Sequence, residues 1–131
     1  MKAQEIHILP TKTTPEILLT SRGMIKIKGR SIDESRAKAP EQVINWIDDY
    51  LANPAESTEV NIALEFLNSF NTVILTSTLK KISQVNQKGN RLVIKWYYEE
   101  DDDDLYERGE YISSAIDFPF EFIVAKKISD C

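Results

Sequence analysis

The residues able to do chemistry in this chain are few, and their spacing fits no common active site. A single histidine, His7, stands near the start without a Gly-x-Ser-x-Gly sequence, which argues against a Ser-His-Asp hydrolase. The four glycines have neither phosphate-loop nor dinucleotide-binding spacing. The single cysteine, Cys131, excludes an intrachain disulfide and a cysteine metal cluster. We therefore expect a protein that is not an enzyme and that carries no cofactor.

The most visible charged feature is the acidic run from Glu99 to Asp104. Such a run is a candidate for divalent-cation binding or for docking a basic partner. It lacks the glycine and the spaced terminal glutamate of an EF-hand loop. Acidic residues are also typical of the first turn of a helix, where they face the positive end of its dipole. The sequence favours a helix start here and leaves the metal site and the docking patch as alternatives.

The hydroxyl of Ser69 stands where a strand-like run gives way to a helix-like run. The common role of serine at such a junction is the N-cap, in which its oxygen accepts a hydrogen bond from a backbone N–H two or three residues later. Asn68 also suits the cap, and that arrangement leaves the hydroxyl of Ser69 exposed. A phosphate on it would face free N–H groups and would add about two negative charges. Spacing alone favours a serine cap, and both arrangements stay open.

The elements that must position this junction form a strand–helix–strand unit. The run from Thr58 to Leu67 alternates as a strand does. The face expected to be buried carries Val60, Ile62, Leu64 and Phe66. The run from Val73 to Val85 has helical spacing with Val73 on its apolar face, Gly89 suits its end, and Arg91 to Tyr98 alternates again. This spacing implies two parallel strands joined by a right-handed crossover.

The rest of the chain alternates between strand-like and helix-like runs. In chain order these are an edge strand at Glu5–Leu9, a hairpin of Ile17–Leu19 with Met24–Lys28, a helix at Pro40–Leu51, a helix at Leu105–Ile116 and a strand at Phe118–Val124. Residues from about 126 to 131 are expected to form a loose tail. The predicted fold class is α/β: a single domain, residues 1–131, with a mixed β-sheet and helices packed on it.

The charge balance narrows the classes of partner. The chain has 21 acidic and 16 basic residues, a net charge of −5. Nucleic acids and anionic membranes need a basic face, so neither is expected as a partner. No apolar run approaches the roughly 20 residues of a membrane span, and the first residues lack the core of a signal peptide. We expect a cytoplasmic protein, and a lone cysteine agrees with that compartment.

Segments spread over nearly the whole chain share the pattern of one family. They are Thr11-x-x-Thr14-Pro15-x-Ile17, Gly29-Arg30-Ser31 with Glu34, Pro40 with Trp46 and Tyr50, Leu64-Glu65-Phe66-Leu67-Asn68-Ser69, and Trp96 to Asp104 with Glu107-x-Gly109-Glu110. In this order they resemble the SiaC-type regulatory phosphoproteins of bacterial signalling. The tryptophan-aromatic-acidic segment is the most specific part of the resemblance.

The resemblance implies a STAS-like fold and a partner switch similar to that of anti-sigma factor antagonists. In that family a serine or threonine directly after the asparagine of the strand is phosphorylated by a dedicated serine/threonine protein kinase and restored by a phosphatase. The phosphorylation state decides whether the domain binds its effector, which in the best-known type is a diguanylate cyclase. Carried onto this sequence, the phosphoacceptor is Ser69, and the partner-binding residues around it are Asn68, Phe70, Asn71 and Thr72.

The chain also departs from the family pattern. Phe70, Asn71 and Thr72 stand where the family commonly has further serines and a lysine, Asp33 replaces a proline, and Ser35 replaces an asparagine. These departures leave a second hypothesis open, a constitutive interaction adaptor of the same fold that does not switch. A third hypothesis is a divalent-metal-binding domain built on the acidic run.

Overall fold

The computed structural model of the protein describes residues 4–33 and 39–131. Glu34, Ser35 and the predicted link through Lys38 lie outside the described residues. The strands are β1 (Ile6–Ile8), β2 (Glu16–Leu19), β3 (Met24–Ser31), β4 (Ser57–Leu67), β5 (Arg91–Glu99) and β6 (Glu121–Ala125). The helices are α1 (Ala39–Ala52), α2 (Ser69–Ile82), α3 (Gln84–Gln87), α4 (Asp103–Ile116) and the 3₁₀ turn η1 (Ile128–Asp130). The predicted α/β class is confirmed.

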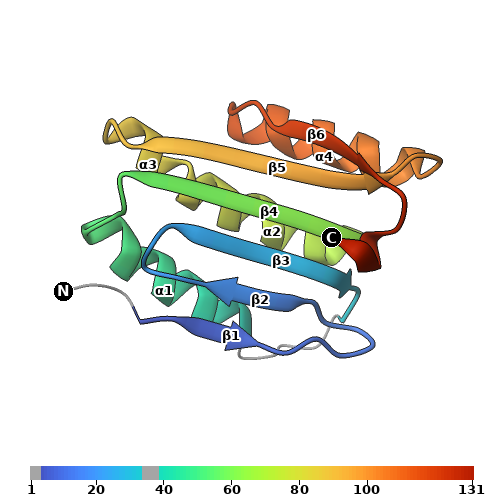
Figure 1. The fold of residues 1–131 in the computed structure, drawn as a ribbon, viewed down its shortest axis with the longest axis horizontal. Helices are drawn as coiled ribbons and strands as arrows, with labels where there is room; N and C mark the ends of the chain where they lie inside the picture. The colour runs from blue at the N-terminus through green and yellow to red at the C-terminus, as the bar shows by residue number, and fades with distance from the viewer. Residues whose placement is uncertain (1–3, 34–38) are drawn as a thin grey trace.

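The six strands form one mixed sheet in chain order, from β1 to β6. The pairs β1–β2 and β2–β3 are antiparallel, whereas the pairs β3–β4, β4–β5 and β5–β6 are parallel. The predicted hairpin and the predicted parallel pair β4–β5 are both confirmed. Because parallel crossovers are right-handed and each strand is added on the same side of the previous one, the connecting helices fall on one face. Figure 1 shows them together behind the sheet.

The hydrophobic core lies between the sheet and this single layer of helices. Its side chains with almost no exposed surface include Ile25, Ile47, Val60, Ile62, Leu79, Ile94, Trp96 and Ile112. Burying each such side chain stabilises the fold by about 1.5–3 kcal/mol. The core therefore fixes α1, α2 and α4 against the sheet. Their N-terminal ends lie together where the parallel strands β3, β4 and β5 end.

The end of β4 contains an irregularity that the sequence does not reveal. Between Leu64 and Phe66, β4 advances by two residues while β3 advances by one, so Glu65 is an extra residue in the pairing. Such a bulge breaks the strict alternation of side chains. As a result Phe66 is 50% exposed and Leu67 is buried. The prediction that Phe66 faces the core is therefore wrong, because alternation does not continue across the bulge.

The C-terminal residues 126–131 are packed, and the prediction of a loose tail is wrong. The side chain of Ile128 is 1% exposed. Its backbone N–H donates to the Glu99 carboxylate at 2.9 Å, and the ammonium of Lys28 donates to the backbone carbonyl of Cys131 at 2.6 Å. Figure 1 shows this turn in front of the sheet, opposite the helices. One buried isoleucine in a polar segment is too weak a sequence pattern to predict this contact.

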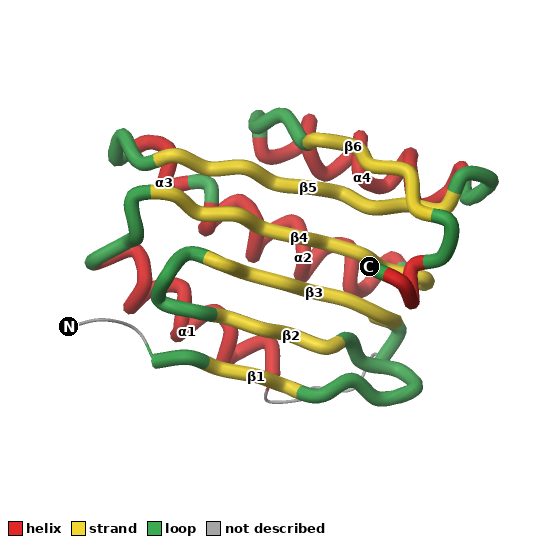
Figure 2. The backbone as a smooth tube through the Cα atoms, in the orientation of Figure 1, coloured by secondary structure: helices red, strands yellow, loops and turns green. Residues whose placement is uncertain are grey.

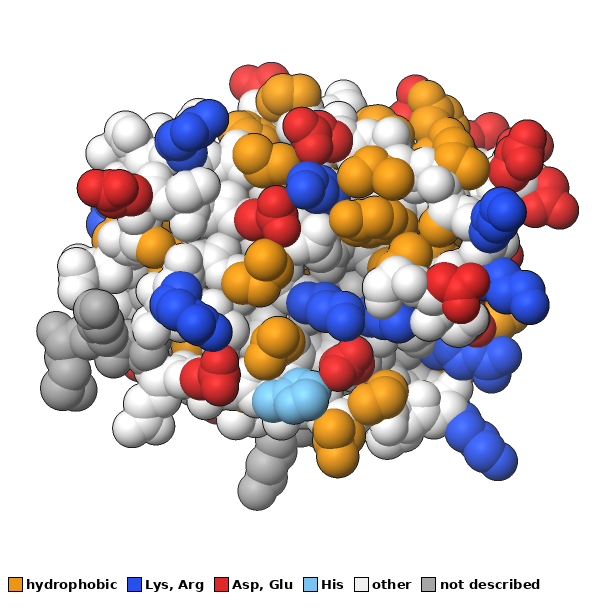
Figure 3. All heavy atoms as spheres, viewed as in Figure 1, with side chains coloured by type: hydrophobic (Ala, Val, Ile, Leu, Met, Phe, Trp, Pro, Cys, Tyr) orange, Lys and Arg blue, Asp and Glu red, His pale blue; other side chains and the backbone are white. Residues whose placement is uncertain are grey.

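The remainder of the helix-free face is covered by charged side chains of both signs among apolar ones (Figure 3). The Lys95 ammonium lies 2.9 Å from the Glu59 carboxylate, and His7 lies 2.8 Å from Glu16. Hydrogen bonds from Asn61 and Lys95 lower the pKa of the Glu59 carboxyl. An exposed ion pair such as that of Lys95 with Glu59 contributes little to the stability of the fold. Together they make this face suited to contact with water.

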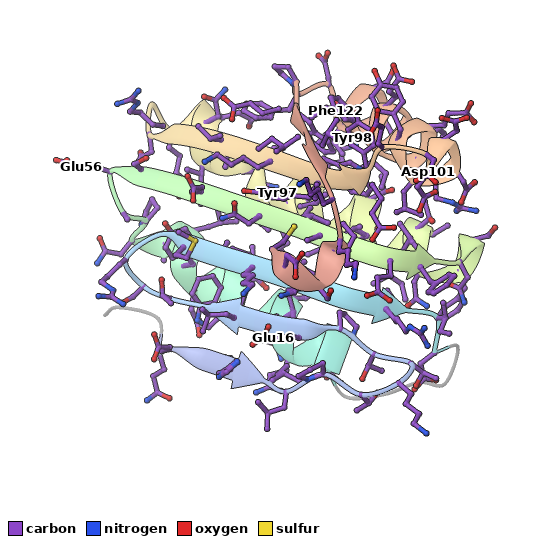
Figure 4. All side chains as sticks on the ribbon, turned by 45° about the vertical axis from the view of Figure 1, so that its right-hand side comes forward. Glu16, Glu56, Tyr97, Tyr98, Asp101 and Phe122 are labelled. Atoms are coloured by element: carbon purple, nitrogen blue, oxygen red, sulfur yellow. The ribbon has the colours of Figure 1, made fainter. Side chains whose placement is uncertain are left out.

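Helix α4 approaches the sheet closely at Gly109. A Cβ atom built there would lie 2.7 Å from the indole nitrogen of Trp96 and 2.8 Å from the ring of Phe122. That indole N–H donates to the Leu105 carbonyl at 3.0 Å, which ties β5 to the first turn of α4. Figure 4 shows Tyr98 and Phe122 together beside α4. Trp96 and Gly109, both in the segments that carry the family resemblance, therefore hold α4 in place.

We predict that Gly109→Ala destabilises the protein, although alanine is favoured over glycine in helices by about 1 kcal/mol. The added methyl group collides with the buried Trp96 ring, and overpacking of this kind costs about 1–3 kcal/mol. Urea unfolding followed by tryptophan fluorescence measures the loss. Ser114→Ala, at an exposed position of the same helix, is the control and should leave the free energy of unfolding unchanged or slightly higher. Equal stability of the two variants would contradict the packing role.

Candidate functional site

The junction between β4 and α2 is built around Asn68. Its backbone is extended, with φ −84° and ψ 172°, and its side-chain oxygen accepts the backbone N–H of Asn71 at 2.8 Å. Asn68 is therefore the N-cap, and Ser69 is the first residue of the helix. The side chain of Ser69 is exposed. Of the two arrangements that the sequence left open, the structure has the one in which the serine hydroxyl is not the cap.

The same asparagines hold the loop that follows β3. The Asn68 amide donates to the carbonyl of Ile32, and the Asn71 amide donates to the carbonyl of Asp33, each at 3.0 Å. In turn the backbone N–H groups of Ile32 and Asp33 both donate to the carbonyl of Thr13, each at 3.0 Å. The start of α2 is thus tied to two segments that are far away in the sequence.

The segment from Thr11 to Thr14 forms a closed turn at this edge. The two hydroxyl oxygens of Thr11 and Thr14 lie 2.6 Å apart, and the backbone N–H of Thr14 donates to the Thr11 hydroxyl at 3.0 Å. Pro15 and β2 follow directly. In Figure 2 this loop and the end of β3 lie at the same edge of the sheet. Three segments of the family pattern, distant in the chain, therefore meet around Asn68.

On the other flank, helix α4 contacts the start of α2 through Arg108. Its Nη1 donates to the hydroxyl oxygen of Thr72 at 2.9 Å, and its Nε donates to the Asp104 carboxylate at 3.1 Å. The Thr72 hydroxyl donates in turn to the carbonyl of Asn68 at 2.8 Å. Thr72 is only 7% exposed. A chain of hydrogen bonds thus runs from α4 through a buried threonine to the junction.

Three large apolar side chains close to Ser69 in the sequence are exposed. Phe66 and Phe70 are 50% and 45% exposed, and Val73 is 68% exposed. The guanidinium carbon of Arg30 lies 4.8 Å from the ring centre of Phe66. The prediction that Val73 lies on the buried face of its helix is wrong, because Val73 and Leu75 are about 200° apart around a helix, and Leu75 is the one that is buried. We call Phe66, Phe70 and Val73 the apolar rim.

An apolar pocket of about 210 Å³ lies beside this rim, between α1, α2 and the strands β2 and β3. Its lining includes Ile17, Val43, Phe70, Ile74 and Leu75. Phe70 therefore belongs both to the exposed rim and to the pocket. Open apolar surface next to a candidate modification site is typical of a place where another protein binds.

The predicted site residues occupy different places around the junction. Ser69 and Phe70 point outward, whereas the amides of Asn68 and Asn71 are engaged with the loop after β3, and Thr72 faces α4. Sequence reasoning did not find Phe66, Val73 or Arg108. The i, i+4 spacing of Asp104 and Arg108 was visible in the sequence, but nothing in it indicated the contact of Arg108 with α2.

The acidic run opens helix α4. Asp102 is its N-cap, with its carboxylate accepting the backbone N–H of Leu105 at 3.1 Å, and Asp103 and Asp104 lie in the first turn. This is the helix start that the sequence favours. Within residues 4–33 and 39–131, no group of three or more acidic, histidine or cysteine side chains is arranged to hold a metal ion. In the same residues, no helix is long and apolar enough to cross a membrane.

A one-sided sheet with exposed apolar side chains and an open apolar pocket beside one helix start is typical of a domain that binds other proteins. Comparison with known proteins agrees with this class. Residues 8–125 match the model of the SiaC family regulatory phosphoproteins, and the chain belongs to this family. The resemblance seen in the sequence is confirmed. The chain is also 26% identical, over 117 residues, to an uncharacterised protein of Pseudomonas aeruginosa strain UCBPP-PA14, with 88% of this chain and 93% of that protein covered.

Two solved structures share the fold. The crystal structure of apo-SiaC from Pseudomonas aeruginosa has a TM-score of 0.80 at 25% identity, covering 92% of this chain and 99% of that one. A second crystal structure holds the diguanylate cyclase SiaD of the same organism in complex with its activator SiaC, and there the TM-score is 0.82 at 25% identity, with the same coverage. The related protein is thus a regulatory partner of an enzyme.

We predict that Asn68 and Ser69 differ sharply in their contribution to stability. Asn68→Ala removes the helix cap and a tie to the loop after β3, and losing an N-cap costs about 1–2 kcal/mol. Ser69→Ala removes an exposed hydroxyl that is not the cap, and exposed substitutions change stability by about 0.5 kcal/mol or less. Urea denaturation of the two variants beside the wild type measures the difference. Equal losses would show that the serine, too, caps the helix.

Proposed function

We propose that this protein is a phosphorylation-controlled partner switch with Ser69 as its phosphoacceptor. The observation that supports this most is the cap at Asn68, which leaves the hydroxyl of Ser69 exposed at the first helical position. A kinase can modify this hydroxyl without breaking the hydrogen bond that starts α2. A phosphate at that position also faces the positive end of the helix dipole, which favours it.

The apolar rim indicates which phosphorylation state binds the effector. Phe66, Phe70 and Val73 offer the exposed apolar surface on which an effector docks, and Phe70 also lines the adjacent pocket. Phosphorylation of Ser69 adds about 1.5–2 negative charges beside that surface. Removing such a charge from water is costly unless the partner supplies a cation. We therefore propose that the unphosphorylated protein binds the effector and that phosphorylation releases it.

The proposed effector is a diguanylate cyclase. The related SiaC of Pseudomonas aeruginosa is bound to such an enzyme as its activator, and this chain shares that protein's fold. A serine/threonine protein kinase and a phosphatase complete the cycle. Since the kinase consumes ATP, we place the cycle in the cytoplasm. The protein itself is proposed to act by binding and to catalyse no reaction.

A constitutive adaptor is the second candidate, and the residues after Ser69 favour it. Phe70, Asn71 and Thr72 replace the serines and the lysine that are common in the family. In the structure, however, Asn71 and Thr72 have their side chains engaged within the protein. Their replacement therefore changes the support of the helix start more than the surface offered to a kinase.

We expect the cognate kinase to phosphorylate the protein at Ser69. Incubation with kinase and ATP, followed by mass-spectrometric mapping, should place one phosphate there, and Ser69→Ala should abolish the incorporation. Ser77→Ala is the control, because Ser77 is exposed on the same helix two turns later. A phosphate that maps to another residue would remove Ser69 from the proposal.

Effector binding should respond to charge at Ser69 and to the apolar rim. We predict that Ser69→Asp and Phe70→Ala each weaken binding to the cyclase by at least about tenfold, which is about 1.4 kcal/mol. Ser69→Ala should bind as the wild type does. Calorimetry or a pulldown measures this, with Ser77→Asp as the matched control that adds the same charge about 12 Å along the helix. Binding that ignores Ser69→Asp but is lost in Phe70→Ala would favour the constitutive adaptor.

A further inference from the structure

Arg108 is a cation that helix α4 brings to the first turn of α2. Resting on the function proposed above, we propose that Arg108 binds the phosphate of phosphorylated Ser69 and leaves Asp104 to do so. The switch would then include a second element: phosphorylation at the start of α2 changes the charge pairing at the start of α4. This role belongs to a residue outside the predicted site.

The geometry of α2 points Ser69 towards α4. Successive residues of an α-helix are rotated by about 100°. Ser69 therefore lies about 60° around the helix from Thr72, whereas Phe70 lies about 160° from it. Because the hydroxyl of Thr72 receives the Nη1 of Arg108 at 2.9 Å, Ser69 is on the same flank as the guanidinium. Side chains three residues apart on a helix are neighbours, with Cβ atoms about 5–6 Å apart.

Arg108 is held at this position by both of its current partners. Its side chain is 27% exposed, whereas that of Asp104 is 67% exposed. An exposed i, i+4 ion pair of this kind is weak, because water screens it. A phosphate offers about twice the charge and three acceptor oxygens, and arginine binds such groups in a bidentate manner. The phosphate is therefore the stronger partner, and it can displace Asp104 while the guanidinium stays near Thr72.

Other cations at this edge of the described chain lie on different sides of the junction. Arg30 follows the outward alternation of β3 and pairs with Glu65 on the helix-free face of the sheet, at 3.5 Å. Lys12 belongs to the Thr11–Thr14 turn, of which Thr13 and Thr14 line the pocket on the α1 side of α2. Arg108 alone of these three approaches α2 on the flank that carries Ser69.

Acidic groups on α4 oppose the binding of a phosphate beside Arg108. Asp103 and Asp104 in its first turn repel a phosphate and raise its second pKa, which is about 6 in an unpaired phosphoserine. A bound guanidinium lowers that pKa, because it favours the dianion. The pKa of the phosphate therefore reports which of the two contributions dominates, and hence whether Arg108 is bound to it.

The experiment uses the full chain with phosphoserine installed at position 69 during synthesis, so that no kinase is needed. A ³¹P NMR titration measures the second pKa of the phosphate. We expect Arg108→Gln to raise this pKa by about half a unit or more relative to the wild type. Arg108→Lys should raise the phosphate pKa less than Arg108→Gln does, because lysine keeps the positive charge but cannot make the bidentate contact of a guanidinium. Arg30→Gln and Lys12→Gln, which remove the same charge nearby, are the matched controls and should titrate as the wild type does.

A second variant tests the proposal with Arg108 in place, so that the result does not depend on whether the Arg108 variants fold. Asp104→Asn removes the competing carboxylate and should lower the phosphate pKa, and circular dichroism of each variant checks that the helices are intact. Equal pKa values in wild type and Arg108→Gln would overturn the proposal, as would a rise caused only by Arg30→Gln or Lys12→Gln. Such a failure leaves the switch itself standing, because the switch is tested separately, by the residue that the kinase phosphorylates and by the response of effector binding to the state of Ser69.

Discussion

The hydrogen bond from the backbone N–H of Asn71 to the side chain of Asn68 is the interaction on which the site depends. At 2.8 Å it satisfies one of the free N–H groups at the start of α2. It also leaves the hydroxyl of Ser69 out of the cap, so that the start of the helix depends on one residue and the proposed modification falls on the next. If the serine were the cap, adding a phosphate would remove a bond that starts the helix. With asparagine as the cap, the helix start is independent of the modification.

The one-sided architecture decides where this junction can be contacted. Because the parallel strands are added in one direction, the connecting helices share one face, and their N-terminal ends lie at the same edge of the sheet. The opposite face carries exposed ion pairs, such as Lys95 with Glu59, and the packed C-terminal turn. The exposed apolar side chains near Ser69 are the surface that a partner is proposed to contact.

The loop after β3 and the helix α4 support the junction from two sides. Asn68 and Asn71 bind the carbonyls of Ile32 and Asp33, and Thr72 receives Arg108. Residues that the family pattern places far apart are therefore parts of one supported helix start. The likeness to the SiaC structures extends over 92% of this chain, although only the surface around one serine is proposed to change.

The sequence by itself determined the fold class, the β2–β3 hairpin, the strand–helix–strand unit and the position of the exposed serine to within one residue. These follow from side-chain periodicity and local preferences, which act over a few neighbouring residues. Tertiary structure alone decided that Asn68 caps α2, because the amides of Asn68 and Asn71 are also held by the loop after β3. It decided that Phe66 turns outward, because β4 has one more residue than β3 at the bulge. It also decided that Arg108 contacts Thr72. Contacts between distant segments depend on register and packing, and periodicity within one segment carries no information about either.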